Sequence, residues 1–176
     1  MLAQRLQQAA GFLQANDYQQ ALDTLTAMES SGAESADFWQ LLALAHKGLG
    51  QLKNAEDSYL KSVQLLPQPH VLTNLANLYR QQRRYEEAEA RYQQALELES
   101  SHLPARVNYG QLLLEIKQIN ASAQQFAAAL EQKPEHLNAQ IGLAQASQQL
   151  GDQENALALF QKVLSIDNNN AAALNG

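Results

Sequence analysis

The sequence predicts an all-α solenoid of five helix–turn–helix units, followed by the start of a sixth. Three observations lead to this prediction. Small residues recur every 33 or 34 positions, apolar residues recur at helical spacing inside each unit, and a turn signal falls at the same place in each unit. With 45% hydrophobic residues, the 176-residue chain has enough apolar side chains to fold as one domain.

The repeat is clearest in two columns of small residues and one column of large residues. The first small column is Ala9, Ala43, Ala76, Gly110 and Ala144. The second small column is Ala21, Ala55, Ala88, Ser122 and Ala156. Four positions after each member of the second column stand Leu25, Tyr59, Tyr92, Phe126 and Phe160. The small residues allow paired helices to approach closely, and the large residues are expected to fill the space between units.

Each unit is expected to hold two helices joined by a tight turn. From Trp39, residues of one helical face recur at Leu42 and His46. The pattern restarts after Gly50 and stops at Pro67, because proline has no N–H to donate. The turn positions are Asn16, Gly50, Arg83, Lys117 and Gly151. Gly and Asn suit the left-handed end of a helix, whereas Arg and Lys do not, so we expect strain or a different geometry in those two turns.

Two segments of the chain resemble the tetratricopeptide repeat (TPR) family. The first reads Trp39-x2-Leu42-Ala43-x2-His46 and continues as Ala55-x3-Tyr59-x2-Ser62-x4-Pro67, and the second reads Leu75-Ala76-x2-Tyr79 and then Ala88-x3-Tyr92-x2-Ala95. The resemblance covers nearly the whole chain and implies a right-handed superhelix. The implied units are 2–35, 36–68, 69–102, 103–136 and 137–170. Residues 171–176 would begin a sixth unit, so we expect the array to belong to a longer protein.

The resemblance also implies where a ligand would lie, because the first helix of each TPR unit lines the concave surface. The rows of these helices give a groove that is apolar in the first two units and rich in side-chain amides from Asn74 onward. Amides offer donors and an acceptor, and they therefore match the main chain of an extended peptide. The expected groove residues are Leu41, Leu44, Lys47, Asn74, Asn77, Arg80, Asn108, Gln111 and Gln145.

Two known modes of TPR binding can be compared with this groove. Asn74 and Asn108 stand one unit apart in one row, as in an asparagine ladder, although the alternative is that both are simply solvated. The carboxylate clamp of chaperone-binding TPR domains is not expected. The places of its cations are held by uncharged residues, namely Thr73, Asn138 and Gly142. Lys47 and Arg80 could each meet one acidic side chain and no more.

The composition argues against several classes of partner and location. The net charge of −6 disfavours nucleic acid, and the one basic cluster, Arg80, Arg83 and Arg84, is expected to be a solvated helix end. The absence of cysteine fits a reducing compartment. The sequence contains neither a signal-peptide core nor an apolar run of about 20 residues, so we expect a cytoplasmic protein with no membrane insertion.

The sequence does not predict catalysis. It has no Gly-rich phosphate loop, no HExxH and no GxSxG motif. His102 and His136 hold the same place in successive units, which packed helices keep about 10 Å apart, too far to share a metal ion. We therefore expect no enzymatic activity, no metal and no cofactor.

The leading functional hypothesis is an interaction module that binds a peptide or a partner protein in its concave groove. Two alternatives remain open. One is a non-catalytic, substrate-recruiting arm of a larger enzyme such as a transferase. The other is a homo-oligomeric scaffold, formed through an apolar end face that Leu157, Phe160 and Leu164 of the final helix pair would leave open.

Overall fold

A computed structural model describes residues 2–28, 33–166 and 171–174, and over these residues the chain is helical and contains no strand. The helices are α1 (Leu2–Gln14), α2 (Tyr18–Thr26), α4 (Ala36–Gly48), α5 (Leu52–Leu65), α6 (Pro69–Gln81), α7 (Tyr85–Leu98), α8 (Leu103–Glu115), α9 (Ile119–Gln132), α10 (Leu137–Leu150), α11 (Gln153–Ile166) and α12 (Ala171–Leu174). The predicted all-α class is therefore confirmed. Of the expected start of a sixth unit, α12 is described, while Asn175 and Gly176 lie outside the described residues.

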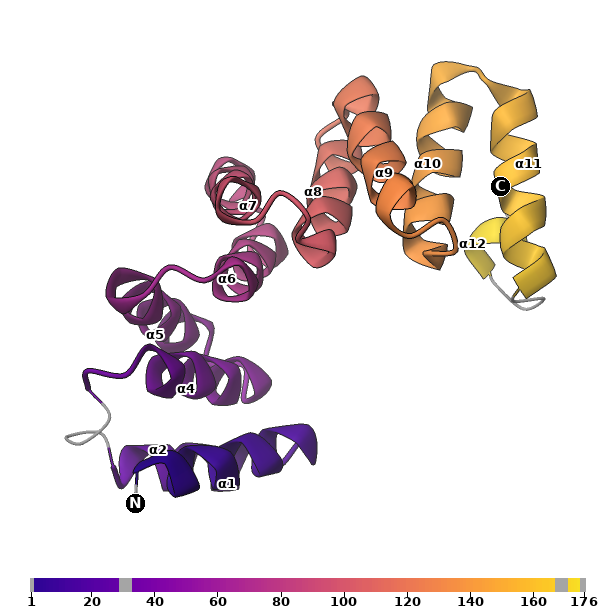
Figure 1. The fold of residues 1–176 in the computed structure, drawn as a ribbon. Coiled ribbons are helices and arrows are strands. Elements are labelled where there is room, and N and C mark those ends of the chain that lie inside the picture. The colour runs from indigo at the N-terminus through magenta and orange to yellow at the C-terminus, as the bar shows by residue number, and fades with distance from the viewer. Residues whose placement is uncertain (1, 29–32, 167–170, 175–176) are drawn as a thin grey trace.

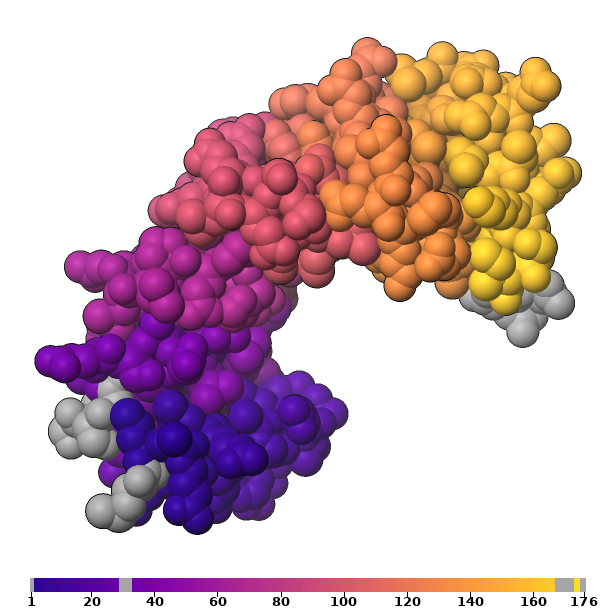
Figure 2. Space-filling model, in the orientation of Figure 1, coloured from indigo at the N-terminus to yellow at the C-terminus, as the bar shows by residue number. Residues whose placement is uncertain are grey.

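The helices form antiparallel pairs that follow one another along an arc (Figure 1). The second helix of each pair packs on the first helix of the next pair, at α2–α4, α5–α6, α7–α8 and α9–α10. The first helices of successive pairs also contact one another: α6 contacts α8, and α8 contacts α10. In the middle of the arc, α4 and α6 lie toward its inner side, and α5 and α7 lie toward its outer side. Figure 2 shows the same arc as a molecule hollowed on one side.

The turn inside each pair uses one left-handed residue, at the place that the sequence predicts. The φ angles are 58° at Asn16, 74° at Gly50, 61° at Arg83, 64° at Lys117 and 86° at Gly151. Of the two alternatives expected for Arg83 and Lys117, strain and a different geometry, the structure shows the first, because both turns keep the left-handed geometry. Both residues adopt the conformation that glycine adopts elsewhere in the chain, despite the contact between Cβ and the following carbonyl that disfavours it.

The large column fills the space between helices as predicted. Leu25, Tyr59, Tyr92 and Phe126 are fully buried, and Phe160 is 3% exposed. The largest apolar cluster extends from α4 to α8 around Tyr59 and Tyr92, and smaller clusters flank it on both sides. Because a fully buried large apolar side chain contributes several kcal/mol, this column stabilises the packing of the units.

Three first helices hold the connection before them by the same contact. Trp39 Nε1 donates to Ala33 O (2.9 Å), Arg106 Nη2 to Ser100 O (2.5 Å) and Gln140 Nε2 to Pro134 O (2.6 Å), each six residues upstream. Indole, guanidinium and amide thus serve one purpose at equivalent positions. In addition, the Trp39 ring packs in the cluster of the first two pairs, with Lys61 Nζ 3.8 Å from its centroid.

Two expectations about the surface need correction. The basic cluster is not simply solvated, because Arg80 pairs with Glu115 (2.7 Å) and Arg84 pairs with Glu56 (2.7 Å) and Glu87. The carboxylates stabilise the charged guanidinium of Arg84 and raise its pKa.

The apolar end face is also smaller than expected. Phe160 is buried and Leu164 is half-buried, because both pack in a cluster that includes Ala173 of α12. Of the three residues expected there, only Leu157 is open to solvent, at 58% exposure.

Candidate functional site

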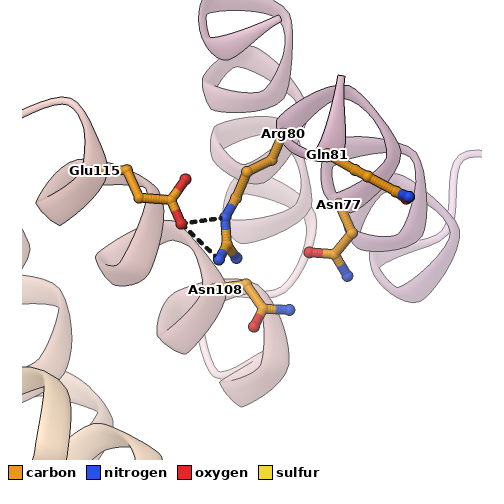
Figure 3. A pocket seen from close by; sticks show the side chains of 5 residues that line it. All are labelled: Asn77, Arg80, Gln81, Asn108 and Glu115. Carbon is orange, nitrogen blue, oxygen red and sulfur yellow. Dashed lines mark hydrogen bonds and ion pairs between the residues drawn. The ribbon is translucent and has the colours of Figure 1, made fainter. Parts of the chain in front are cut away.

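Predicted groove residues from successive first helices surround three hollows. The central hollow, of about 470 Å³, is lined by Asn77, Arg80, Gln81, Asn108 and Glu115 (Figure 3). The amide hollow, of about 320 Å³, is lined by Arg80, Val107, Asn108, Gln111, Asn138, Ile141 and Gln145. The apolar hollow, of about 430 Å³, is lined by Leu13, Gln14, Tyr18, Leu44, Lys47 and Gly48. Arg80 and Asn108 line both of the first two hollows, which are therefore neighbours.

An ion pair dominates the central hollow. Arg80 extends from α6 toward Glu115 at the end of α8, and the amides of Asn77 and Asn108 lie nearby (Figure 3). Glu115 Oε1 accepts from Arg80 Nη2 at 2.7 Å and from Nε at 3.0 Å. Both side chains are about one-third exposed or less. The guanidinium is therefore already neutralised by a neighbour one unit away, and this part of the surface carries no net charge.

A hydrogen bond from a buried tyrosine fixes the orientation of the Asn77 side chain. Tyr92 of α7 is fully buried and donates its hydroxyl to Asn77 Oδ1 at 2.5 Å. Burial raises the pKa of Tyr92 to about 12, so the phenol remains a donor at neutral pH. Because Oδ1 is occupied by Tyr92, the Asn77 Nδ2 group is left to donate to a ligand.

The amide hollow offers several neutral polar groups at once. Asn108 and Gln111 reach it from α8, and Asn138 and Gln145 reach it from α10. Val107 and Ile141 add apolar surface between these amides. Such a lining can exchange hydrogen bonds with N–H and C=O groups of a main chain and tolerates small apolar side chains.

The apolar hollow is different in chemistry. The Tyr18 ring lies directly on the α4 backbone, since a Cβ built on Gly48 would come within 2.2 Å of Tyr18 Cδ1. The Tyr18 hydroxyl donates to Asn16 Oδ1 (2.7 Å), which fixes the ring as a wall. Lys47 stands half-buried beside Leu13 and Leu44, and burial lowers the pKa of its ammonium group.

The remaining predicted residues are placed less centrally. Leu41 packs against the cluster of the first two pairs, and Asn74 is half-buried on α6, three positions before Asn77. Two positions that the sequence rows placed in the groove are instead buried. Gly142 lies under the Phe126 ring, where a Cβ would come within 2.3 Å, and Thr73 donates its hydroxyl to Pro69 O at 2.7 Å.

Some lining residues were missed by reading rows alone. Gly48, Gln81 and Glu115 each stand one helical turn beyond Leu44, Asn77 and Gln111, so one further row would have found them. Tyr18 was missed because it starts a second helix, and the rows covered only first helices.

Neither a metal site nor a membrane-spanning helix is found among the described residues. No three His, Cys, Asp or Glu side chains within 2–28, 33–166 and 171–174 come close enough to hold a metal ion. In the same part of the chain, no helix has the length and apolar character needed to cross a membrane.

Comparisons with solved structures show the same fold elsewhere. YrrB, described as a TPR protein with an unusual peptide-binding site, has a TM-score of 0.80 at 20% identity, over 97% of this chain and 89% of its own. The pilF protein of Pseudomonas aeruginosa has a TM-score of 0.88 at 22% identity, over 98% of this chain and 79% of its own. A MamA structure has a TM-score of 0.81 at 22% identity, over 93% and 98%.

Sequence comparisons give both a family and distant relatives. The RRP5 homologs of Mus musculus and Homo sapiens are each 29% identical over 149 residues, or 84% of this chain. The chain spans 8% of the length of these curated relatives. Tetratricopeptide repeat models match residues 36–69, 70–102 and 110–171. With matches over consecutive segments and neighbours of one architecture, the chain belongs to the tetratricopeptide repeat family and is a protein-interaction module.

Proposed function

We propose that the module binds an extended segment of a partner protein along the inner faces of α4, α6, α8 and α10. The observation that carries this proposal is the convergence of side-chain amides from successive first helices on adjoining hollows. Seven of the nine groove residues expected from sequence line the three hollows: Leu44, Lys47, Asn77, Arg80, Asn108, Gln111 and Gln145. The peptide-binding site named for YrrB, a protein of the same fold, supports the same class of ligand.

The amides favour recognition of the main chain rather than of particular side chains. Each can donate to a peptide C=O or accept from a peptide N–H, whatever the residue. The Arg80–Glu115 pair removes the field that would otherwise attract an acidic ligand to the centre of the groove. A bound segment would therefore lie over α6, α8 and α10 with neutral or small residues.

This proposal can be tested with ten-residue peptides selected from a random display library on the intact chain. The triple variant Asn108→Ala, Gln111→Ala, Gln145→Ala should bind the selected peptides at least tenfold more weakly, since each hydrogen bond contributes about 0.5–1.5 kcal/mol. Isothermal titration or fluorescence anisotropy measures the affinity.

Asn120→Ala, on the exposed start of α9, serves as the matched control and should leave affinity unchanged. N-methylation of the peptide main chain should cause a loss similar to that of the triple variant. Equal affinity of the wild type and the triple variant for every selected peptide would exclude the amide-lined groove as the binding site.

A further inference from the structure

Among the residues that the structure describes, no neighbouring carboxylate balances the charge of Lys47 in the groove. Its counterpart one unit later is Arg80, which pairs with Glu115. The counterpart of Glu115 one unit earlier is Gln81, which has no charge. Within the described residues the ammonium group of Lys47 has no hydrogen bond or ion pair, and burial is the one influence that moves its pKa.

This arrangement leaves a desolvated cation at the edge of an apolar space. An ammonium group that loses water without gaining a partner destabilises the protein. Beside it, Leu13, Leu44 and the fixed Tyr18 ring form the walls of a hollow of about 430 Å³, large enough for a leucine or phenylalanine side chain. The hollow is therefore complementary to an apolar group that carries a negative charge next to it.

We propose that the apolar hollow anchors the bound segment by taking one of its large apolar side chains, while Lys47 pairs with an acidic side chain adjacent to it in sequence. This inference rests on the proposed peptide-binding function and adds a sequence preference to it. We assign the charge to a side chain rather than to a chain terminus, because α4 lies between α1 and α6 along the arc (Figure 1), so that a bound segment can continue past Lys47 on both sides.

The subsite determines which end of the bound segment lies over the first two units. An apolar–acidic pair would be held by the first two units, and the main chain would then extend over the amides of α6, α8 and α10. The Arg80–Glu115 pair lies among the amides of the central hollow, so a second acidic residue placed there gains nothing from Arg80. The preferred ligand therefore has one charge at one end and a neutral remainder.

The test uses acetylated and amidated ten-residue peptides with one neutral Ser/Ala context. In three of these peptides Leu is fixed near one end, and the position that follows it carries Glu, Gln or Lys. In a fourth peptide, Ala–Glu, Ala replaces the Leu to test the apolar contact. The intact wild-type chain should bind the Leu–Glu peptide about three- to tenfold tighter than the Leu–Gln peptide, as partly exposed charge pairs do. The Ala–Glu peptide should bind at least fivefold more weakly than Leu–Glu.

Substitutions of Lys47 assign the preference to this residue. Lys47→Met should abolish the difference between Leu–Glu and Leu–Gln, and Lys47→Glu should shift the preference to Leu–Lys. Lys53→Met, on the exposed start of α5, is the matched control and should keep the wild-type preference. Thermal melting of all three variants shows that they are folded under the conditions of the titration.

The outcomes separate this inference from the proposed function. Binding of all peptides with a preference that Lys47→Met does not change would overturn the subsite and leave the groove intact. A further Leu–Gln peptide keeps a free C-terminal carboxylate in place of the amide. Binding that depends on Lys47 for this peptide and not for the amidated Leu–Glu peptide would overturn the assignment to an acidic side chain. No binding of any peptide at millimolar concentration would overturn both the subsite and the groove.

Discussion

Tyr59 and Tyr92 occupy the same place in successive units, yet only one of them has a partner for its hydroxyl. Tyr92 donates to Asn77 Oδ1, whereas Tyr59 Oη is buried with no hydrogen-bond partner among the described residues. The position that corresponds to Asn77 one unit earlier is Leu44, which cannot accept. The same aromatic ring thus carries a satisfied polar group in one unit and an unsatisfied one in the other.

Removing the two hydroxyls should therefore have opposite effects on stability. Tyr92→Phe leaves Asn77 without its buried donor and should lower the free energy of unfolding by about 1–2 kcal/mol. Tyr59→Phe removes an unsatisfied group and should leave that free energy unchanged or raise it by up to about 1 kcal/mol. Urea unfolding followed by circular dichroism measures both, and equal losses in the two variants would contradict the assignment.

At this scale the sequence predicted which residues share a row but not what they contact. Asn77 and Arg80 were expected on the inner surface from their rows together with the resemblance to TPR proteins, and the structure places both around the central hollow. The hydroxyl of Tyr92 beneath Asn77 and the carboxylate of Glu115 beside Arg80 could not be predicted. Both contacts depend on rotamers and on the offset between packed helices, and the repeat period does not specify either.

The turns between paired helices show how far local rules hold at the scale of an element. Gly50 and Gly151 adopt the left-handed conformation without a steric penalty, and Asn16 accepts a hydrogen bond from Tyr18 that supports it. Arg83 and Lys117 adopt it at a cost, because their exposed side chains bring a Cβ into the crowded region. Packing of the helices on either side thus overrides the preference of the turn residue.

Glycine at the two costly positions should relieve this strain. A non-glycine residue in the left-handed region destabilises the folded state by about 1–2 kcal/mol. Replacing it by glycine removes this cost, but the greater conformational entropy of glycine in the unfolded chain offsets about 0.5–1 kcal/mol of the gain. Arg83→Gly and Lys117→Gly should therefore each raise the free energy of unfolding by up to about 1 kcal/mol.

The reverse exchange is the control for this prediction. Gly151→Ala should lower the free energy of unfolding by about 1 kcal/mol. Because no atom beyond the adjacent residues lies within 4 Å of the added Cβ, the loss reports backbone conformation alone. Thermal melting of the three variants checks the signs. A loss of stability in both glycine variants would show that the left-handed turns are not strained.

Element boundaries were more predictable than the faces that elements present. The sequence placed the turn residues correctly because a helix end, a left-handed residue and a new apolar pattern are all local signals. It placed Gly142 in the groove, at a position where the carboxylate clamp carries a cation. The Phe126 ring occupies that position instead, and only packing between α9 and α10 determines this contact.

For the molecule as a whole, cohesion is uneven along the arc. The cluster from α4 to α8 contains the fully buried Leu75, Tyr59 and Tyr92, whereas the clusters at either end are smaller. In an array, each unit is stabilised by its neighbours, so a unit with one neighbour opens more easily than a unit with two.

Native-state hydrogen exchange should reveal this gradient. We expect the amides of α6 and α7 to be the most protected, and those of α1 and α11 to open at a free energy lower by about 2 kcal/mol or more. Mass spectrometry of exchanged peptides across a urea series, with one peptide from each helix, measures the order. Protection that is uniform from α1 to α11 would indicate a single cooperative unit and contradict the prediction.

The overall architecture was the most predictable property of this chain. One period of 33 or 34 residues, repeated along the sequence, requires each pair to pack on the next in the same way. The division of the groove into an apolar part and an amide part also followed from sequence. The Arg80–Glu115 ion pair and the packing of Phe160 with Ala173 could not be predicted from the sequence. Both join residues from different units, and the repeat period does not specify how these residues are placed relative to one another.

Trp39 is the single tryptophan of the sequence, so tryptophan fluorescence arises from one position. The indole is 6% exposed, and it lies in the apolar cluster of the first two pairs with an ammonium group over its face. Its emission therefore reports the polarity and dynamics of one joint, and the surface over α8 and α10 contributes nothing to it. Tryptophan emission therefore reports unfolding at this joint, whereas far-UV circular dichroism reports the helix content of all units together.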